Sequence, residues 1–331
     1  MRALVFERKL EYVTDYPTPV PKLGEALIRV ARAGICNTDI EIIKGYMNFH
    51  GIPGHEFTGV VEKCEDKDLT GKRVVGEINI GCNTCSFCRN NMRNHCPDRA
   101  VLGILNRNGV FAEYLTLPLS NLHLIPDSIS DDEAVFVEPL AAAFEILSQV
   151  NISSTDKVCV LGDGKLGLLA GQVLASTGCD LVVAGKHKEN LSILEEMGIR
   201  TQLVSTGTAG AIDKLPLQIG DKGGQFDIVI DCTGSSFGIE NALDIVKPGG
   251  KIILKTTVAD TAPLDINRIV IREISLIGSR CGPFKPAICA IETKKVKLLP
   301  LVSAIFFLKD GIEALEFASR RGVLKVILEL D

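Results

Sequence analysis

The chain has 331 residues, of which 46% are hydrophobic and 23% charged, with a formal net charge of −5. This length favours two domains, and the composition is that of a soluble globular protein. No basic block or aromatic-rich basic stripe is present, which argues against nucleic acid as the main partner. The longest uncharged apolar run, at 298–308, is too short to cross a bilayer.

The first 125 residues predict a small β-rich module. The start of the chain carries charges throughout and indicates a first strand rather than a signal peptide. Alternating apolar residues with Gly and Pro punctuation predict further strands at 25–35, 57–64, 72–80 and 109–118. Without a predicted signal peptide or membrane span, we expect a cytoplasmic location. Disulfides are unlikely in that reducing compartment, and the eleven cysteines are an odd number, so we expect free or metal-bound thiols.

Three potential metal ligands lie within this module. Cys36 belongs to GICNTD (34–39), and His55 and Glu56 belong to GIPGHEFTGVVE (51–62). A lone Cys or His is usually a packing residue, but a His-Glu pair among glycines is an unusual place for core packing. A thiolate, an imidazole and a carboxylate suit a catalytic zinc that keeps one coordination position open.

A second cluster, Cys82, Cys85, Cys88 and Cys96, has the spacing C-x2-C-x2-C-x7-C. Short spacings of this kind present several thiolates to one ion, which favours zinc over the alternatives of an iron–sulfur cluster or free thiols. Four cysteine ligands leave no position for water or substrate. We therefore expect this ion to hold a loop and not to take part in chemistry.

The segment 130–150 predicts a helix with an acidic start after Ser130. Glu138 stands inside its apolar run, where an unpaired carboxylate would be costly. Glu138 is therefore a further candidate ligand, the alternative being a buried acid that is hydrogen-bonded for structural reasons. Because no linker rich in Pro or Ser follows, we expect the two domains to share a long helix.

From residue 157 onward, apolar strands alternate with amphipathic helices. The strands are expected at 157–162, 180–185, 226–234, 251–257 and 274–279, and the helices at 167–178, 189–198 and 239–250. This alternation predicts a parallel sheet with helices on both faces. The tail, 305–330, predicts one helix and a closing strand.

The first of these strands leads into LGDGKLG, with glycines at 162, 164 and 167. In a strand–turn–helix context this motif predicts a dinucleotide site. Gly162 permits the tight turn, Gly164 lets backbone amides approach a pyrophosphate, and Gly167 lets the helix pack on the strand. We assign Lys165 and Leu166 to the same site. The alternative is a purely structural turn.

The second strand ends at Gly185, where an acid that binds the adenosine ribose is expected. Lys186, His187 and Lys188 follow. A small residue followed by basic residues favours the 2′-phosphate of NADP. The alternative is that these are surface charges and that NAD binds. Thr233 and Gly234, after a later strand, are expected to line the nicotinamide side.

Taken together, the order and spacing of these motifs resemble the zinc-dependent medium-chain alcohol dehydrogenases, in particular the branch of sorbitol, threonine and archaeal glucose dehydrogenases. The motifs are GICNTDIEI, GHEFTGVVE, the cysteine cluster, GVFAEYL, EPLA, GDGKLG, DCTG and KPGGKIIL. The resemblance implies an α/β chain in which a GroES-like β-rich catalytic domain (1–145 and 280–331) is interrupted by a Rossmann domain (146–279).

The same resemblance implies the roles of individual residues. Cys36, His55 and Glu56 would bind the catalytic zinc, with Glu138 as a direct or exchanging ligand. Asp39 would orient His55, and the Thr38 hydroxyl would lie nearest the substrate oxygen. Where many relatives carry a histidine as the outer proton acceptor, this chain has Glu41.

The resemblance implies hydride transfer between an alcohol (a polyol, sugar or secondary alcohol) and NAD(P), with two zinc ions per chain and NADP favoured. We expect a small-molecule substrate, no nucleic-acid or membrane partner, and a homodimer or homotetramer. The alternative is a non-catalytic descendant that binds zinc and nucleotide. A zinc-ribbon nucleic-acid module would not explain the glycine motif, and a zinc-free quinone reductase would lack the cysteine cluster.

Overall fold

The computed structural model describes residues 1–204, 226–256 and 264–330. The chain divides into two compact units, one of Met1–Glu138 with the segment from Phe284 onward, and one of Pro139–Pro283. The division falls inside α4 (Val137–Gln149). Among the described residues, no helix is both long and apolar enough to cross a membrane.

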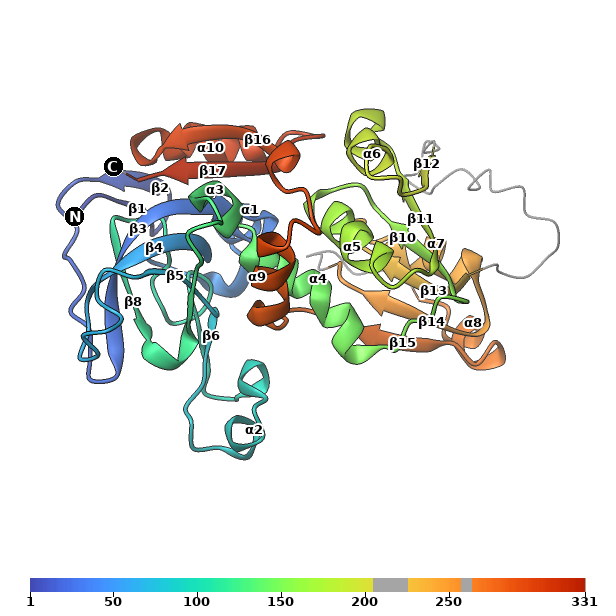
Figure 1. The fold of residues 1–331 in the computed structure, drawn as a ribbon, viewed down its shortest axis with the longest axis horizontal. Coiled ribbons are helices and arrows are strands. Elements are labelled where there is room, and N and C mark those ends of the chain that lie inside the picture. The colour runs from blue at the N-terminus through green and yellow to red at the C-terminus, as the bar shows by residue number, and fades with distance from the viewer. Residues whose placement is uncertain (205–225, 257–263, 331) are drawn as a thin grey trace. The chain divides into compact units, whose positions relative to one another are not determined.

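The first unit is built on a seven-stranded sheet in the order β16-β17-β3-β4-β5-β9, with β8 also paired to β3. Its strands are β3 (Glu25–Ile35), β4 (Glu56–Lys63), β5 (Arg73–Gly76), β8 (Tyr114–Pro118), β9 (Leu122–Leu124), β16 (Val302–Phe307) and β17 (Lys325–Glu329). The C-terminal β17 pairs antiparallel with β3, so the last strand of the chain lies beside an early one (Figure 1).

Smaller elements complete this unit. β1 (Ala3–Phe6) and β2 (Leu10–Val13) form a hairpin, and β6 (Asn79–Ile80) pairs with β7 (Ala100–Val101). The helical segments are α1 (Asn37–Ile43), η1 (Tyr46–Asn48), α2 (Ser86–Arg89), η2 (Arg93–His95), η3 (Leu119–Asn121), α9 (Phe284–Glu292), η4 (Leu299–Leu301), η5 (Leu308–Asp310) and α10 (Gly311–Ala318). The sequence interpretation did not include α9 or β16.

Two predicted strands differ from the structure. The strand expected at 72–80 is divided into β5 and β6, because Asn121 engages both backbone groups of Glu77 between them: Glu77 N donates to Asn121 O, and Asn121 Nδ2 donates to Glu77 O. The strand expected at 109–118 begins only at Tyr114. Before it, Gly109 and Phe111 hydrogen-bond to the segment at 52–53 instead.

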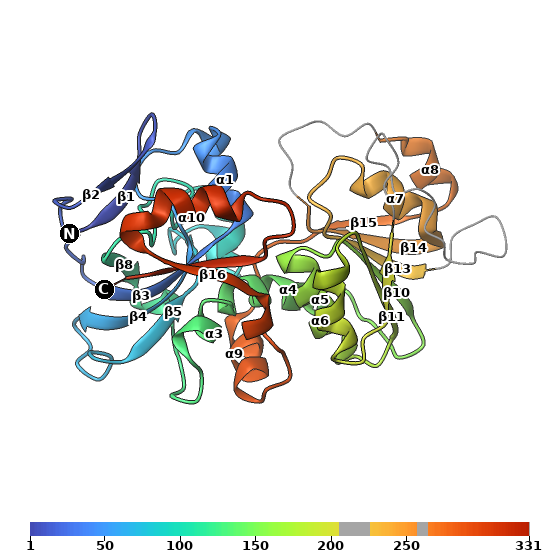
Figure 2. The ribbon, with the colours of Figure 1, turned by 90° about the horizontal axis from the view of Figure 1, so that it is seen from above.

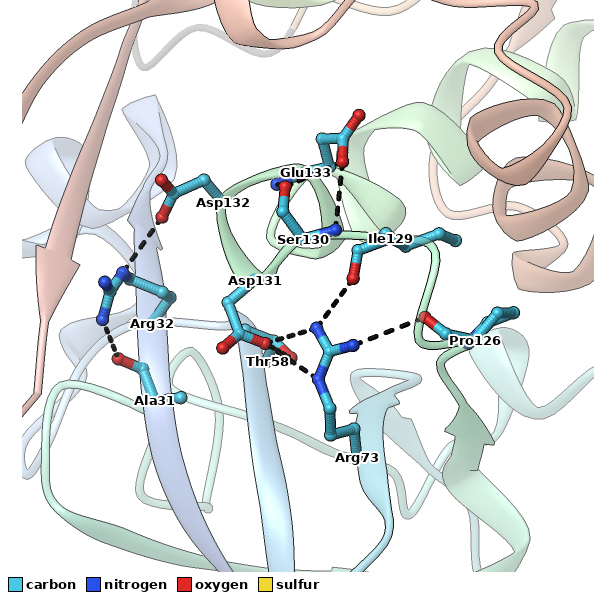
Figure 3. Close-up of polar contacts among 10 residues, drawn as sticks. All are labelled: Ala31, Arg32, Thr58, Arg73, Pro126, Ile129, Ser130, Asp131, Asp132 and Glu133. Carbon is cyan, nitrogen blue, oxygen red and sulfur yellow. Dashed lines mark hydrogen bonds and ion pairs between the residues drawn. The ribbon is translucent and has the colours of Figure 1, made fainter.

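The helix expected at 130–150 consists of α3 (Asp131–Ala134) and α4. Ser130 caps α3, since its hydroxyl accepts from Glu133 N while the Glu133 carboxylate accepts from Ser130 N. Arg73 pairs with Asp131 at 2.6 Å and Arg32 with Asp132 at 3.0 Å (Figure 3). These contacts fix α3 to the sheet just before Glu138.

The second unit confirms the predicted parallel sheet, in the order β12-β11-β10-β13-β14-β15. Its strands are β10 (Lys157–Leu161), β11 (Asp180–Gly185), β12 (Thr201–Leu203), β13 (Phe226–Asp231), β14 (Val246–Leu254) and β15 (Ser275–Gly278), and its helices are α5 (Lys165–Ala175), α6 (Lys188–Glu195), α7 (Gly238–Ile245) and α8 (Ile266–Ile271). Helices α5 and α6 lie on one side of the sheet and α7 and α8 on the other (Figure 2).

The strand order of this unit reverses between β10 and β13, which is where open sheets of this kind bind ligands. The helix expected at 239–250 ends at Ile245, and β14 begins directly after it. Residue 257, the end of the strand expected at 251–257, lies outside the described residues.

Candidate active site and nucleotide site

The structure brings Cys36, His55 and Glu56 together. Their ligand atoms all lie within 4.8 Å of one another. Strand pairing explains this, because Gly34 near the end of β3 stands opposite Glu56 at the start of β4. His55 and Glu56 are buried, whereas Cys36 is half-buried. A sulfur, a nitrogen and an oxygen donor thus converge at one end of the sheet.

Glu56 has a partner that the sequence reasoning missed. Lys325, the fully buried first residue of β17, forms an ion pair with Glu56 Oε2. Gly34 leaves room for this pair, since a Cβ there would lie 2.3 Å from Glu56 Oε2. The signal in the sequence was a lysine inside the apolar run LKVILEL. Glu56 Oε1 is buried without a hydrogen-bond partner and is the oxygen left for a metal.

Asp39 contacts His55, but without the hydrogen bond that the family resemblance implies. Its Oδ2 accepts from Cys36 N at 2.8 Å, and its Oδ1 lies 3.2 Å from His55 Nδ1, without the alignment of a full hydrogen bond. Burial alone would lower the pKa of His55. The charge of Asp39, with a smaller contribution from Cys36, outweighs burial and raises that pKa well above its usual value.

The other predicted residues around this cluster occupy α1 and α4. The Cys36 thiol donates to Thr38 Oγ1 at 3.7 Å, so this hydroxyl lies beside the cluster. Glu41 pairs with Lys44 at 2.9 Å within α1. Glu138 is half-buried in the first turn of α4 and is not one of the three residues whose ligand atoms converge.

The four predicted cysteines form a separate lobe between β6 and β7 (Figure 1). The ligand atoms of Cys82, Cys85, Cys88 and Cys96 lie within 4.8 Å of one another. Backbone amides point at the sulfurs: Cys82 N lies 3.4 Å from Cys96 Sγ, and Cys85 N lies 3.4 Å from Cys82 Sγ. The Thr84 hydroxyl lowers the pKa of Cys82 to about 6, whereas burial raises that of Cys88 to about 12.

Both clusters fit a zinc ion. The lobe supplies four sulfurs that cannot all be thiolates at such short separations unless a cation balances them. The second cluster supplies mixed donors, and its buried Glu56 Oε1 lacks a hydrogen-bond partner. Three protein ligands leave a coordination position for water or substrate.

In the second unit, the glycine-rich loop has the geometry that the motif predicts. Gly162 has a φ of 113°, which is unfavourable for other residues. A Cβ on Gly167 would lie 1.9 Å from Gly162 O, so α5 approaches the turn as closely as backbone allows. Gly164 is exposed at the start of α5 with open space above it, beside half-buried Lys165 and Leu166. This cradle fits a pyrophosphate.

At the end of β11, a glycine occupies position 185. Gly185 is buried, Lys186 and Lys188 are exposed, and His187 is half-buried. The buried carboxylate of Asp163, which the sequence reasoning overlooked, contacts His187 Nδ1 at 3.1 Å. The motif itself gave the signal, since Asp163 stands between its first two glycines.

Thr233 and Gly234 follow β13 and form a turn that is tied to a buried acid. Thr233 Oγ1 donates to Asp231 Oδ1 at 2.7 Å, and Gly234 N donates to Thr256 Oγ1 at 3.0 Å. Burial raises the pKa of Asp231. The turn therefore lies at the carboxyl end of β13, next to the glycine-rich loop that follows β10.

Comparisons with known proteins identify both parts of the chain. Residues 22–127 match the alcohol dehydrogenase GroES-like domain, and residues 166–293 match the zinc-binding dehydrogenase family. A sorbitol dehydrogenase of Halalkalibacterium halodurans is 27% identical, covering 96% of this chain and 94% of its own. An L-threonine 3-dehydrogenase of Coxiella burnetii is 28% identical over 95% of this chain and 94% of its own.

A solved structure supports the same assignment. An alcohol dehydrogenase from Escherichia coli CFT073, complexed with NADH, is 26% identical, covers 99% of each chain and has a TM-score of 0.88. The predicted fold, a GroES-like β-rich domain with a Rossmann domain, is thereby confirmed. The chain belongs to the zinc-dependent medium-chain alcohol dehydrogenase family.

Proposed function

We propose that this chain is a dehydrogenase that oxidises a polyol, sugar or other secondary alcohol to the carbonyl compound, reducing NADP in preference to NAD. The observation that carries the proposal is the convergence of Cys36, His55 and Glu56 within 4.8 Å in a chain that also carries the glycine-rich loop. The family is one of alcohol and polyol dehydrogenases that use nicotinamide cofactors.

The proposal includes two zinc ions per chain, one at each cluster. Cys36, His55 and Glu56 would hold a zinc that supplies Lewis acidity toward the substrate hydroxyl, and the glycine-rich loop would hold the nicotinamide cofactor that supplies the hydride acceptor. Asp39 keeps His55 Nδ1 facing inward, so that Nε2 is the nitrogen available to the metal. We keep Glu138 as an exchanging ligand because it begins α4 directly after the segment that α3 anchors.

Thr38 is the proposed first acceptor of the substrate's proton. Its hydroxyl lies beside Cys36 Sγ and both accepts and donates. Glu41, three residues along the same helix, is ion-paired with Lys44 at a half-exposed position. We propose that Glu41 passes the proton on to solvent, in the place of the histidine that many relatives carry.

The remaining parts of the proposal concern assembly and location. We propose a homodimer or homotetramer, in which the unpaired edge of β15 is the contact between copies. A cytoplasmic location suits the eleven cysteines, none of which forms a disulfide.

A panel of polyols, sugars and secondary alcohols, assayed by the absorbance of NADPH and NADH, tests the activity. We expect turnover with at least one of these classes and two zinc ions per chain by elemental analysis. Cys36→Ser should abolish turnover and leave one zinc and a folded protein. If nucleotide and both ions bind but no alcohol in the panel is oxidised, the non-catalytic alternative replaces this proposal.

A further inference from the structure

The dinucleotide motif predicts a carboxylate at position 185, the last residue of β11. In this chain the carboxylate at that place belongs to Asp163 instead. Asp163 belongs to the glycine-rich loop and is 5% exposed. A Cβ on Gly185 would lie 2.3 Å from the Cβ of Asp163 and 2.4 Å from its Cγ. The Asp163 side chain therefore fills the space that an acidic side chain at position 185 would need.

Asp163 also holds the turn that begins α6. Its Oδ2 accepts from His187 N at 2.5 Å, and its Oδ1 lies 3.1 Å from His187 Nδ1. The buried Asn190 side chain donates to Asp163 O at 3.0 Å, which ties the same helix to the same loop residue. Because a carboxylate only accepts, Nδ1 carries the hydrogen in this contact. Nε2 is then the ring nitrogen that faces a ligand, and it donates to a phosphate oxygen in the imidazolium form of His187.

The charges at this turn suit an anion. Both oxygens of Asp163 are engaged by His187, which is 38% exposed at its side chain, and the exposed Lys186 and Lys188 flank it. A ribose 2′-hydroxyl is usually bound by an acid at the end of this strand, whereas a phosphate monoester is bound by cations and N–H donors.

We infer that Asp163 is the residue that sets the choice of cofactor. It excludes an acid from the end of β11 and positions His187 so that the turn at 186–188 binds the 2′-phosphate of NADP. This inference rests on the proposed nicotinamide cofactor and names the origin of its selectivity. His187 is the binding residue, and Asp163 is the positioning residue that acts through it.

Direct binding tests the inference without turnover. NADPH and NADH are titrated into the protein and followed by nicotinamide fluorescence, so that each variant yields two values of Kd. His187→Ala should weaken NADPH about tenfold more than NADH, as expected when a charge-assisted hydrogen bond is lost. Asp163→Asn keeps the side-chain volume but removes the charge. It should likewise weaken the binding of NADPH more than that of NADH.

A matched control lies at the opposite end of the same strand. Asp180 begins β11 and pairs with Arg200 at 2.7 Å on the surface, so Asp180→Asn also removes a carboxylate partner but should leave the ratio unchanged. The double variant Asp163→Gly with Gly185→Asp moves the carboxylate from the loop to the strand and should reverse the preference toward NADH. Thermal melting followed by circular dichroism shows whether each variant is folded.

The inference is overturned if folded His187→Ala and the double variant both keep the wild-type ratio of the two Kd values. Failure of the proposed nicotinamide cofactor looks different, because neither nucleotide would then bind the unaltered protein, and failure of the proposed activity alone shows only in turnover, which this titration does not use. A wild-type preference for NADH that neither variant changes would also overturn the inference, while leaving the dehydrogenase proposal in place.

Discussion

At the scale of single residues, Lys325 and Glu56 form a fully buried ion pair. Removing two charges from water is costly, and only their mutual attraction and close geometry offset the cost. Lys325 also lies 5.6 Å from the ring centroid of Phe136, which adds a weaker electrostatic contact. If either partner is removed, an uncompensated charge remains beside His55.

Lys325→Met should therefore lower the free energy of unfolding by about 3–5 kcal/mol, because the Glu56 carboxylate loses its cation. Urea unfolding measures this loss of free energy. Metal is removed beforehand, so that no bound ion replaces the Lys325 charge near Glu56. Lys294→Met is the control, since Lys294 pairs with Glu133 at an exposed position and its loss should cost less than about 1 kcal/mol. If Lys325→Met and Lys294→Met lost the same free energy of unfolding, the assignment of a buried ion pair between Lys325 and Glu56 would be contradicted. Adding Glu56→Gln to Lys325→Met should recover most of the loss.

A second prediction at this scale concerns Asp39, which supports His55 rather than facing the metal position. Asp39→Asn should lower the zinc affinity of the Cys36–His55–Glu56 cluster about 10–100-fold, because the imidazole loses the group that orients it. Titration with a chromophoric chelator should then remove the ion of the Cys36–His55–Glu56 cluster at a lower chelator concentration than in the wild type. The lobe ion should be removed at the same chelator concentration as in the wild type. Unchanged removal of both ions would show that Asp39 does not support the metal site.

At the scale of elements, the capping of α3 secures the segment that leads to Glu138. Ser130→Ala should lower the free energy of unfolding by about 0.5–2 kcal/mol, since the helix loses its N-cap. Urea unfolding measures it, and Ser153→Ala, which removes a hydroxyl from an exposed turn, is the control. A loss no larger than that of the control would contradict a capping role.

The same cap has a pH dependence. Burial tends to raise the pKa of Glu133, but hydrogen bonds from Ser130 and the charge of Lys294 outweigh burial and lower that pKa from its usual value. A lowered pKa in the folded state stabilises the protein above the pKa of the unfolded state, and this contribution is lost as pH falls through the folded value. The difference in stability between the wild type and Glu133→Gln should therefore shrink below about pH 4. Unfolding measured across that range checks the sign.

How far the sequence predicted these elements depends on whether their cause is local. The periodic strands and helices of the second unit and the glycine-rich loop follow from short patterns, and the structure agrees with them. The break between β5 and β6 comes from Asn121, about forty residues away, and could not be read locally. Lys325 and Asp163 were missed for the same reason, because their partners Glu56 and His187 are distant in sequence.

At the scale of the whole molecule, the two metal clusters are independent. The lobe buries few large apolar side chains, and Phe87 and Met92 are each 41% exposed, so a metal bound there would supply much of its folding free energy. Cys96→Ser should reduce zinc from two ions to one per chain and lower the melting temperature. Exposed Cys289→Ser should retain both ions. If Cys96→Ser also kept both, the four cysteines would not be a zinc site.

The insertion of β17 beside β3 has a consequence for biosynthesis. A ribosome delivers the lobe cysteines early, so that lobe can capture its ion while most of the chain is still unmade. Lys325 is synthesised 269 residues after Glu56, and until then Glu56 has no counter-charge. Formation of the reactive centre therefore waits for β17, and a polypeptide interrupted between β15 and β17 would keep its nucleotide-binding half and have a defective centre.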